Sequence, residues 1–333
     1  MRYRVDDMVQ TRWLEAQNHY ESLAVSLRTL LACWDMDRQY DELVAVLGLG
    51  AATVVASDDS LGWWCTYARD ASLIETAELY GLGLRELHPP EATQGLSRSA
   101  EFAQHFRDSY VPLIARALEH GQPVLAWRGW PAPRERLWGV ITSIQGELIF
   151  GHTLWHDGQP LPLTGPAHQV YVVEEFRPPE HDAVTPADLF AHVARQARAV
   201  WAGRWARCPN VQTGAAAYRA WQDALRDPSG RGSAALPLCR QQSQAARVHV
   251  AARSYLATWL RRVAGGLAGD HIELAAHWAN ACDRAGNRLL PYESAEVVKE
   301  LLGQPGGVER VCRAIDDVAK IEANLVKKLE TMQ

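Results

Sequence analysis

The chain has 333 residues, of which 47% are hydrophobic and 22% are charged, a balance that is typical of globular proteins and excludes long disorder. No run approaches the roughly 18 consecutive apolar residues that a membrane-spanning helix needs, so we expect no membrane association. The formal net charge is −5 and no concentrated basic patch occurs, which argues against nucleic-acid binding.

The first half of the sequence combines helical periodicity with strand patterns. Leu23, Leu27 and Leu30 recur at three- and four-residue spacing, so residues 11–34 are predicted to form a helix with one buried face. Further helices are predicted at 37–47, 72–80 and 99–120, the last with Pro112 as a candidate position for a bend. Strands are predicted at 82–87, 123–127, 137–144, 147–150 and 169–175, and residues 51–56 form either a strand or a buried loop. Helices followed by a mostly antiparallel sheet indicate the α+β class.

Strand patterns stop after Pro178-Pro179, and helical patterns continue to the end of the chain. The predicted helices cover residues 186–205, 215–226, 240–264, 272–290, 294–302 and 306–332. Glycine and proline residues separate several of them, as in Asp227-Pro228-Ser229-Gly230. We therefore expect an all-α helical bundle in this half, and a homodimer through it is compatible with the sequence.

The charges divide at the same place. Residues 1–180 carry 14 basic and 24 acidic side chains, a balance of −10, whereas residues 181–333 carry 20 and 15, a balance of +5. We therefore predict two domains, an α+β domain at 1–180 and a helical bundle at 181–333.

The six cysteines are scattered and include no Cys-x-x-Cys pair, which argues against a zinc ribbon or a thioredoxin-type redox pair. The first residues contain no apolar segment of the kind found in secretory signals. We expect free thiols in a cytoplasmic protein, with no metal and no other cofactor.

The segment Asn18-His19-Tyr20-Glu21-Ser22, followed by the leucine-rich residues 23–31, resembles the first helix of papain-like proteins related to the N-terminal domain of the butirosin-biosynthesis acyltransferase. In that family the pattern is roughly His-Cys-Glu-Ser followed by Ala/Leu-Arg-x-Leu-Leu. Further short segments resemble the same family: Asp41-Glu42-Leu43, Gly48-Leu49-Gly50, Gly121-Gln122-Pro123-Val124, Trp138-Gly139-Val140-Ile141 and Ala216-Ala217-Tyr218-Arg219-Ala220-Trp221. The resemblance implies a papain-like fold for residues 1–180.

Two departures from the family pattern concern its chemistry. The resemblance implies a nucleophilic cysteine where Tyr20 stands, and a phenol with an ordinary pKa near 10 is a poor acyl acceptor. It also implies a histidine on the strand that contains Trp138, yet Leu137, Trp138 and Gly139 include none. The resemblance therefore implies a papain-like cleft that can no longer catalyse acyl transfer through a cysteine thioester.

Cys65 is the candidate for a displaced nucleophile. It lies in Trp63-Trp64-Cys65-Thr66-Tyr67, so it could face an aromatic pocket. A buried structural thiol beside core aromatic residues explains the same pattern, and we favour that interpretation.

His152 and Asp157 form a second candidate pair. His152 and His156 have the four-residue spacing of two metal ligands on a helix, but the segment ends in Asp157-Gly158 and is predicted as strand and turn. Residues four apart in a strand are about 13 Å apart, too far to share one ion. We favour ordinary polar roles, while an acid–base pair of His152 and Asp157 stays open.

Two functions follow. The preferred hypothesis is a diverged, non-catalytic papain-like protein, a pseudoenzyme, that binds a peptide or small metabolite in the inherited cleft. The binding residues would be His19, Tyr20, Glu21, Trp63, Trp64 and Trp138. The alternative is an acyltransferase or amide hydrolase with a rebuilt thiol/histidine site around Cys65 and His152.

Overall fold

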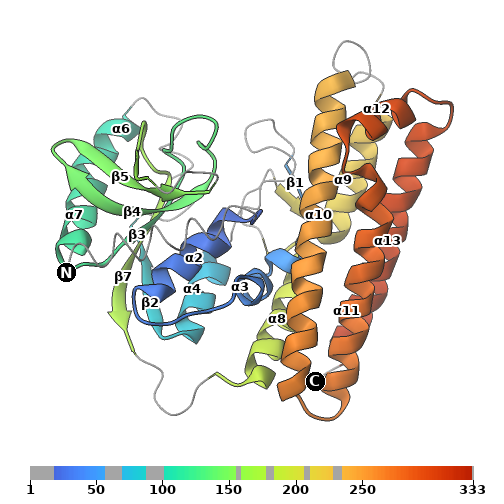
Figure 1. Cartoon of the computed structure of the whole chain (residues 1–333), viewed down its shortest axis with the longest axis horizontal. Coiled ribbons are helices and arrows are strands. Elements are labelled where there is room, and N and C mark those ends of the chain that lie inside the picture. Colours follow the sequence, from blue (N-terminus) through green and yellow to red (C-terminus); the bar gives the residue numbers. More distant parts are fainter. Residues whose placement is uncertain are drawn as a thin grey trace. The chain divides into compact units, whose positions relative to one another are not determined.

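The computed structural model describes residues 19–56, 70–87, 101–154, 159–177, 184–205, 211–227 and 235–331. The chain forms two compact units (Figure 1). The first combines Met1–Leu43 with Leu73–Ala183, and the second combines Val44–Ser72 with Val184–Gln333. The junction between Ala183 and Val184 lies close to the boundary expected at residue 180, whereas residues 44–72 group with the helical second unit.

The first unit is built on a six-stranded sheet with the order β2-β7-β3-β4-β5-β6. Every neighbouring pair in it is antiparallel. The strands are β2 (Leu82–Glu86), β3 (Val124–Trp127), β4 (Trp138–Gln145), β5 (Leu148–Thr153), β6 (Leu161–Pro162) and β7 (Gln169–Phe176). With the helices that accompany it, this sheet confirms the α+β class.

Helices cover both faces of this sheet, and its side chains divide between them. On one face Val124, Ala126, Ile141 and Val170 pack against helix α7 (Val111–Glu119) and the turn before it, with the fully buried Trp130 in the same cluster. On the other face helix α2 (Ser22–Ala32) packs against β4 and β3. The first unit also contains α3 (Tyr40–Val46) and α4 (Asp70–Leu79), each of which continues into the second unit.

The helix predicted over residues 99–120 is interrupted. A short helix α6 (Phe102–His105) leads into a π-helical turn, η3 (Phe106–Tyr110), and only then into α7. Pro112 is the second residue of α7, which directly follows this π-helical turn.

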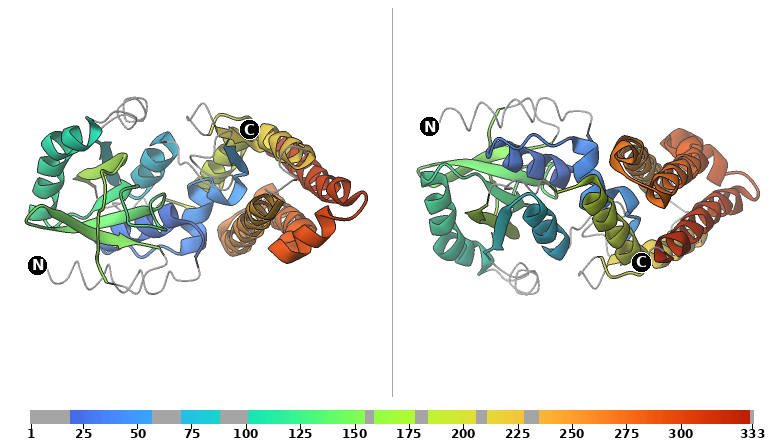
Figure 2. Two further views of the ribbon diagram at one scale, coloured as in Figure 1. Left: turned by 90° about the horizontal axis from the view of Figure 1, so that it is seen from above. Right: turned by 90° about the horizontal axis from the view of Figure 1, so that it is seen from below.

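The second unit is a bundle of helices, which Figure 2 views nearly along their axes. They are α8 (Pro186–Trp201), α9 (Gly214–Arg226), α10 (Ala235–Val263), α11 (Asp270–Leu289), α12 (Ala295–Leu302) and α13 (Gly307–Glu330), with short 3₁₀ turns η2 (Leu49–Ala51), η5 (Ala264–Gly266) and η6 (Leu290–Tyr292). The expectation of an all-α second half is wrong in one detail, because β8 (Val211–Thr213) pairs antiparallel with β1 (Val54–Ala56).

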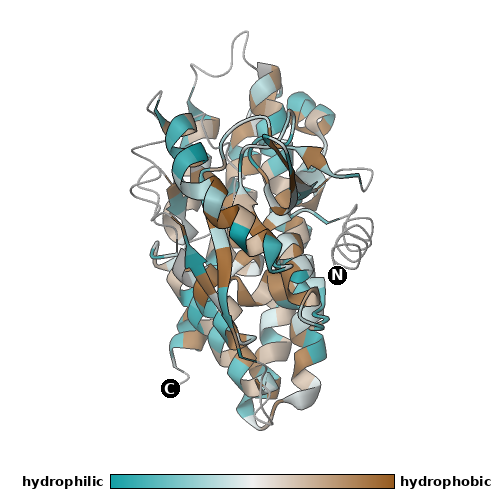
Figure 3. Cartoon of the chain, turned by 90° about the vertical axis from the view of Figure 1, so that its left-hand side faces the viewer, coloured by the Kyte–Doolittle hydropathy of each residue, from teal (hydrophilic) through white to brown (hydrophobic). Residues whose placement is uncertain are grey.

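The core of the second unit lies among α9, α10, α11 and α13. It includes Trp221, Leu289, Val311, Ile315 and neighbouring residues that are almost fully buried. In Figure 3 apolar and polar residues alternate along the ribbons, as expected for helices and strands that each bury one face. Within the described ranges, no helix combines the length and the apolar character that crossing a bilayer requires.

Candidate functional site

Helix α2 begins at a point that aromatic side chains hold in place. Glu21 has an extended backbone and no side-chain cap, so the helix starts at Ser22. The backbone N–H of Glu21 donates to the hydroxyl of Tyr40 over 3.0 Å. The ring of His19 stacks on the ring of Tyr40, with centroids 3.7 Å apart and planes 1° from parallel. Tyr40 therefore fixes the direction in which the chain enters α2.

Strand β4 begins beside this helix start. The backbone N–H of Trp138 donates to Ser22 Oγ over 3.0 Å. On the other side, the hydroxyl of Thr153 donates to the Trp138 carbonyl over 2.6 Å. Because both polar groups of this backbone segment are bound by side chains, the first residue of β4 is held tightly against the start of α2. The structure thus brings Ser22, two residues after Tyr20, to Trp138.

The sequence-predicted residues at this place differ in accessibility. His19 and Tyr20 are partly exposed, whereas Glu21 is 5% exposed and Trp138 only 2%. The Trp138 ring lies 6.4 Å from the Trp127 ring and 6.0 Å from the Tyr171 ring, measured between centroids. A ligand that approaches the start of α2 would therefore meet His19 and Tyr20 first, while Trp138 supports the site from within the core.

His152 lies on the neighbouring strand and on the same face of the sheet. It pairs with Val140, and Val140 and Trp138 point to the same side of β4. His152 is therefore a diagonal neighbour of Trp138, a relation that places side chains about 7–8 Å apart in antiparallel sheets. The imidazole is 2% exposed, so it faces the protein interior on the side that α2 covers.

Four of the predicted site residues, Trp63, Trp64, Cys65 and Asp157, lie outside the described residues. Among the described residues, no three His, Cys, Asp or Glu side chains gather in a way that could hold a metal ion.

The hydrogen bond between Trp138 and Ser22 gives a direct test of this geometry. Replacing Ser22→Ala removes the acceptor from a buried N–H, so we expect the free energy of unfolding to fall by about 1–3 kcal/mol, measured by urea denaturation. Ser26→Ala is the matched control. Ser26 is also buried but only donates back to the Ser22 carbonyl within the same helix, so its loss should cost less than about 1 kcal/mol. Equal losses for the two variants would contradict this role of Ser22.

The second unit contains a buried ion pair that the sequence interpretation missed. Arg253 of α10 is 2% exposed, and its Nε donates to Glu322 of α13 over 2.7 Å. Its two terminal nitrogens donate to the carbonyl oxygens of Gly50, Ala51 and Ala52 and to the Thr53 hydroxyl. All the N–H donors of the guanidinium are therefore used within the protein.

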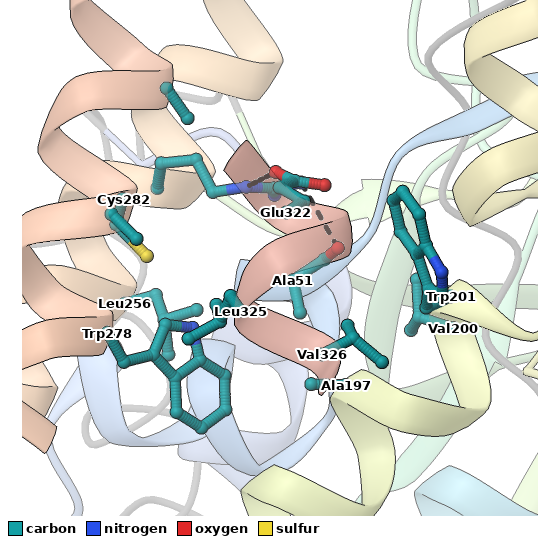
Figure 4. A pocket seen from close by; sticks show the side chains of 13 residues that line it. Ala51, Ala197, Val200, Trp201, Leu256, Trp278, Cys282, Glu322, Leu325 and Val326 are labelled. Atoms are coloured by element: carbon teal, nitrogen blue, oxygen red, sulfur yellow. Dashed lines mark hydrogen bonds and ion pairs between the residues drawn. The ribbon is translucent and has the colours of Figure 1, made fainter. Parts of the chain in front are cut away.

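A small cavity adjoins this ion pair (Figure 4). Most of its wall is apolar or aromatic, from Val200, Trp201, Leu256, Trp278, Leu325 and Val326. Its volume is about 30 Å³. That space suits about two water molecules, since a cavity that takes benzene is near 150 Å³. Because the Arg253 donors are already used and the space is small, this cavity is not a substrate site.

Cys282 also lines the cavity, and its environment disfavours a nucleophilic role. Complete burial raises the pKa of the Cys282 thiol to about 12, so the thiolate is scarcely populated near neutral pH. The cavity region therefore serves the packing of the bundle.

A larger open hollow of about 790 Å³ lies beside the end of α8, and its lining includes Arg195, Arg198, Arg204 and Glu330. Arg195 bonds the buried His192 ring over 2.8 Å, and Arg198 lies in the last turn of α8, where a positive charge offsets the helix dipole. These structural roles account for Arg195 and Arg198 without a ligand.

No model of a known protein family matches the sequence, and no curated protein is significantly similar to it. The side chains themselves therefore carry the functional argument, and the start of α2 presents the partly exposed rings of His19 and Tyr20.

Proposed function

We propose that the chain is a diverged papain-like protein without thiol catalysis, which binds a peptide or small metabolite at the start of α2 in the first unit. The hydrogen bond between the Trp138 N–H and Ser22 Oγ carries this proposal. It joins Ser22, two residues after the position where the resemblance implies a cysteine and Tyr20 stands, to Trp138, on the strand where the resemblance implies a histidine and Leu137, Trp138 and Gly139 include none. Neither a phenol nor an indole provides a thiolate and its base at neutral pH.

The accessible aromatic surface supports binding. The partly exposed His19 stacks on the Tyr40 ring, and the partly exposed Tyr20 follows it directly in the chain just before the helix. Aromatic faces suit apolar or planar groups and the edges of peptide side chains. A cytoplasmic location belongs to the same proposal.

Binding can be tested with N-acetyl-phenylalanine amide as a peptide probe. We expect amide signals of residues 19–22 and 138 to shift in two-dimensional NMR when the probe is added, because the probe packs on the Tyr20 ring. Tyr20→Ala should weaken the interaction by about tenfold or more, the equivalent of about 1.4 kcal/mol. Tyr292→Ala in the second unit is the control and should leave the shifts unchanged. Absence of shifts with the unaltered protein, or equal shifts in the Tyr20→Ala variant, would contradict the site.

The alternative is an acyltransferase or amide hydrolase with a rebuilt site around Cys65 and His152. One observation favours it, since His152 lies on the sheet face that also contains Trp138. A histidine there could act as a base if a nucleophile reached it.

Thiol labelling separates the two proposals. The native protein is treated with iodoacetamide near pH 7, and the labelled cysteines are mapped by mass spectrometry over time. We expect Cys65 to react no faster than the unfolded chain, because a non-catalytic protein has no activated thiolate. Fast, selective labelling of Cys65 that is lost in the His152→Ala variant would instead establish the enzyme.

A further inference from the structure

A cluster of hydrogen-bonding groups surrounds the buried Tyr218 hydroxyl in the second unit. The Thr53 hydroxyl lies 2.9 Å from it, His249 Nε2 lies 2.9 Å from it, and Glu322 Oε2 lies 2.7 Å from it. Tyr218 and His249 are 2% and 3% exposed. Arg253 completes the cluster through its bonds to Glu322 and Thr53.

The protons in this cluster can be assigned from the partners of each group. Thr53 Oγ1 accepts from Arg253, so its own hydrogen is donated to Tyr218. Burial alone would raise the pKa of Glu322, but the Arg253 charge and the hydrogen bonds lower it to about 2, so the ionised carboxylate accepts a hydrogen bond from the Tyr218 hydroxyl. The single hydroxyl hydrogen of Tyr218 is thus used in the bond to Glu322. In the contact with His249, Tyr218 can only accept, so His249 Nε2 carries a hydrogen and donates it to the Tyr218 oxygen.

We infer that His249, fixed as the neutral Nε2–H tautomer, forms an acid-sensitive clasp that holds the segment Gly50–Thr53 on helices α9, α10 and α13. The other ring nitrogen, Nδ1, is buried and has no hydrogen-bond partner among the described residues. Adding a proton there would create a buried N–H without an acceptor and a second positive charge beside Arg253.

The clasp acts on the segment through Arg253. This side chain bonds the carbonyls of Gly50, Ala51 and Ala52 and the hydroxyl of Thr53, so a charge that disturbs Arg253 loosens the whole segment. Three ionisable groups face His249 within the described chain: Arg253 of α10, Glu322 of α13 and Tyr218 of α9. Glu322 lies 3.5 Å from Nε2 and partly offsets the Arg253 charge.

The direction of the pH effect follows from the His249 pKa. Burial and then the Arg253 charge lower it from 6.5 to about 4 in the folded protein. An opened segment exposes the ring and restores the ordinary pKa, so the open form binds the proton more strongly. The stabilising effect is therefore complete above about pH 6.5 and is lost as the pH falls toward 4.

Two measurements test the clasp. Nitrogen-15 NMR of the histidine rings near pH 7 should show His249 with a protonated Nε2 and an unprotonated Nδ1. Hydrogen exchange by mass spectrometry, corrected for the intrinsic rate, should show the opening equilibrium of residues 49–54 rising by about 100-fold between pH 6.5 and pH 4.

His249→Gln keeps an amide N–H near the Nε2 position but cannot titrate, so the change with pH in residues 49–54 should fall below about threefold. His271→Gln removes an exposed histidine of the same unit and should leave the change as in the unaltered protein. An Nδ1–H tautomer of His249 near pH 7, or the same pH response in the His249→Gln variant, would overturn the clasp. The NMR and hydrogen-exchange results on the unaltered protein together test the clasp even if the variant does not fold.

Discussion

Replacing Arg253→Met is expected to lower the free energy of unfolding by about 3–5 kcal/mol, because it leaves the Glu322 carboxylate buried without its partner. The loss includes the donors that now satisfy the carbonyl oxygens of Gly50, Ala51 and Ala52. Methionine fills a similar volume, so the change removes charge and hydrogen bonds rather than packing. Urea denaturation monitored by circular dichroism measures the effect.

The matched control is Arg261→Met on the same helix. Arg261 pairs with Asp283, but both side chains are about half exposed, so its loss should cost less than about 1 kcal/mol. The double variant Arg253→Met with Glu322→Leu removes the stranded carboxylate and should be more stable than the single variant. If Arg253→Met cost no more than the control, the buried pair would not hold the segment.

The position of this ion pair was readable in the sequence. Ala246, His249, Arg253, Leu256 and Leu260 follow one another at spacings of three and four residues, which places His249 and Arg253 on the buried stripe of α10. A charge on such a stripe needs a buried partner.

Helix α13 has the same feature. Ile315, Val318, Glu322, Leu325 and Leu329 form its apolar stripe with one acidic member. The two stripes predict that a basic and an acidic residue meet in the bundle core. They do not predict that residues 50–53, about 200 positions earlier in the chain, supply the remaining partners, because no local pattern contains that information.

The pairing of β1 with β8 and the contact at the candidate site also could not be predicted from local sequence patterns. Strands β1 and β8 have three residues each, too few to show an alternating pattern, and they are more than 150 positions apart. At the candidate site, the resemblance singled out Tyr20 and Trp138, but the hydrogen bond of the Ser22 hydroxyl that joins their segments is a tertiary contact that no local pattern contains. Local patterns predicted which segments form helices and which form strands, because the spacing of apolar residues shows which face of an element is buried. They contain no information on the distances between elements.

Gly139 of β4 and Gly151 of β5 leave room for a core tryptophan, and Gly139 is also the neighbour of Trp138 at the candidate site. Trp130 is fully buried, and its ring lies over Gly139 of β4 and Gly151 of β5. A Cβ at Gly139 would overlap both the Trp130 ring and the carbonyl oxygen of His152. We expect Gly139→Ala to lower the free energy of unfolding by about 3 kcal/mol, measured by urea denaturation, because backbone must move as well as a side chain.

The same substitution should disturb the start of α2, since Gly139 directly follows Trp138 and the moving strand carries the Trp138 N–H away from Ser22. The NMR signal of the Trp138 amide should therefore shift in the folded variant. Gly165→Ala is the control, because nothing lies within 4 Å of its Cβ position, and it should stay within about 0.5 kcal/mol of the unaltered protein. Adding Trp130→Phe to Gly139→Ala relieves the ring overlap but not the one with His152, so it should restore only part of the loss. If the double variant regained the full free energy of unfolding, the Trp130 ring would be the only group that the new methyl group overlaps. Strand β4 would then not be displaced from α2, which would contradict this prediction.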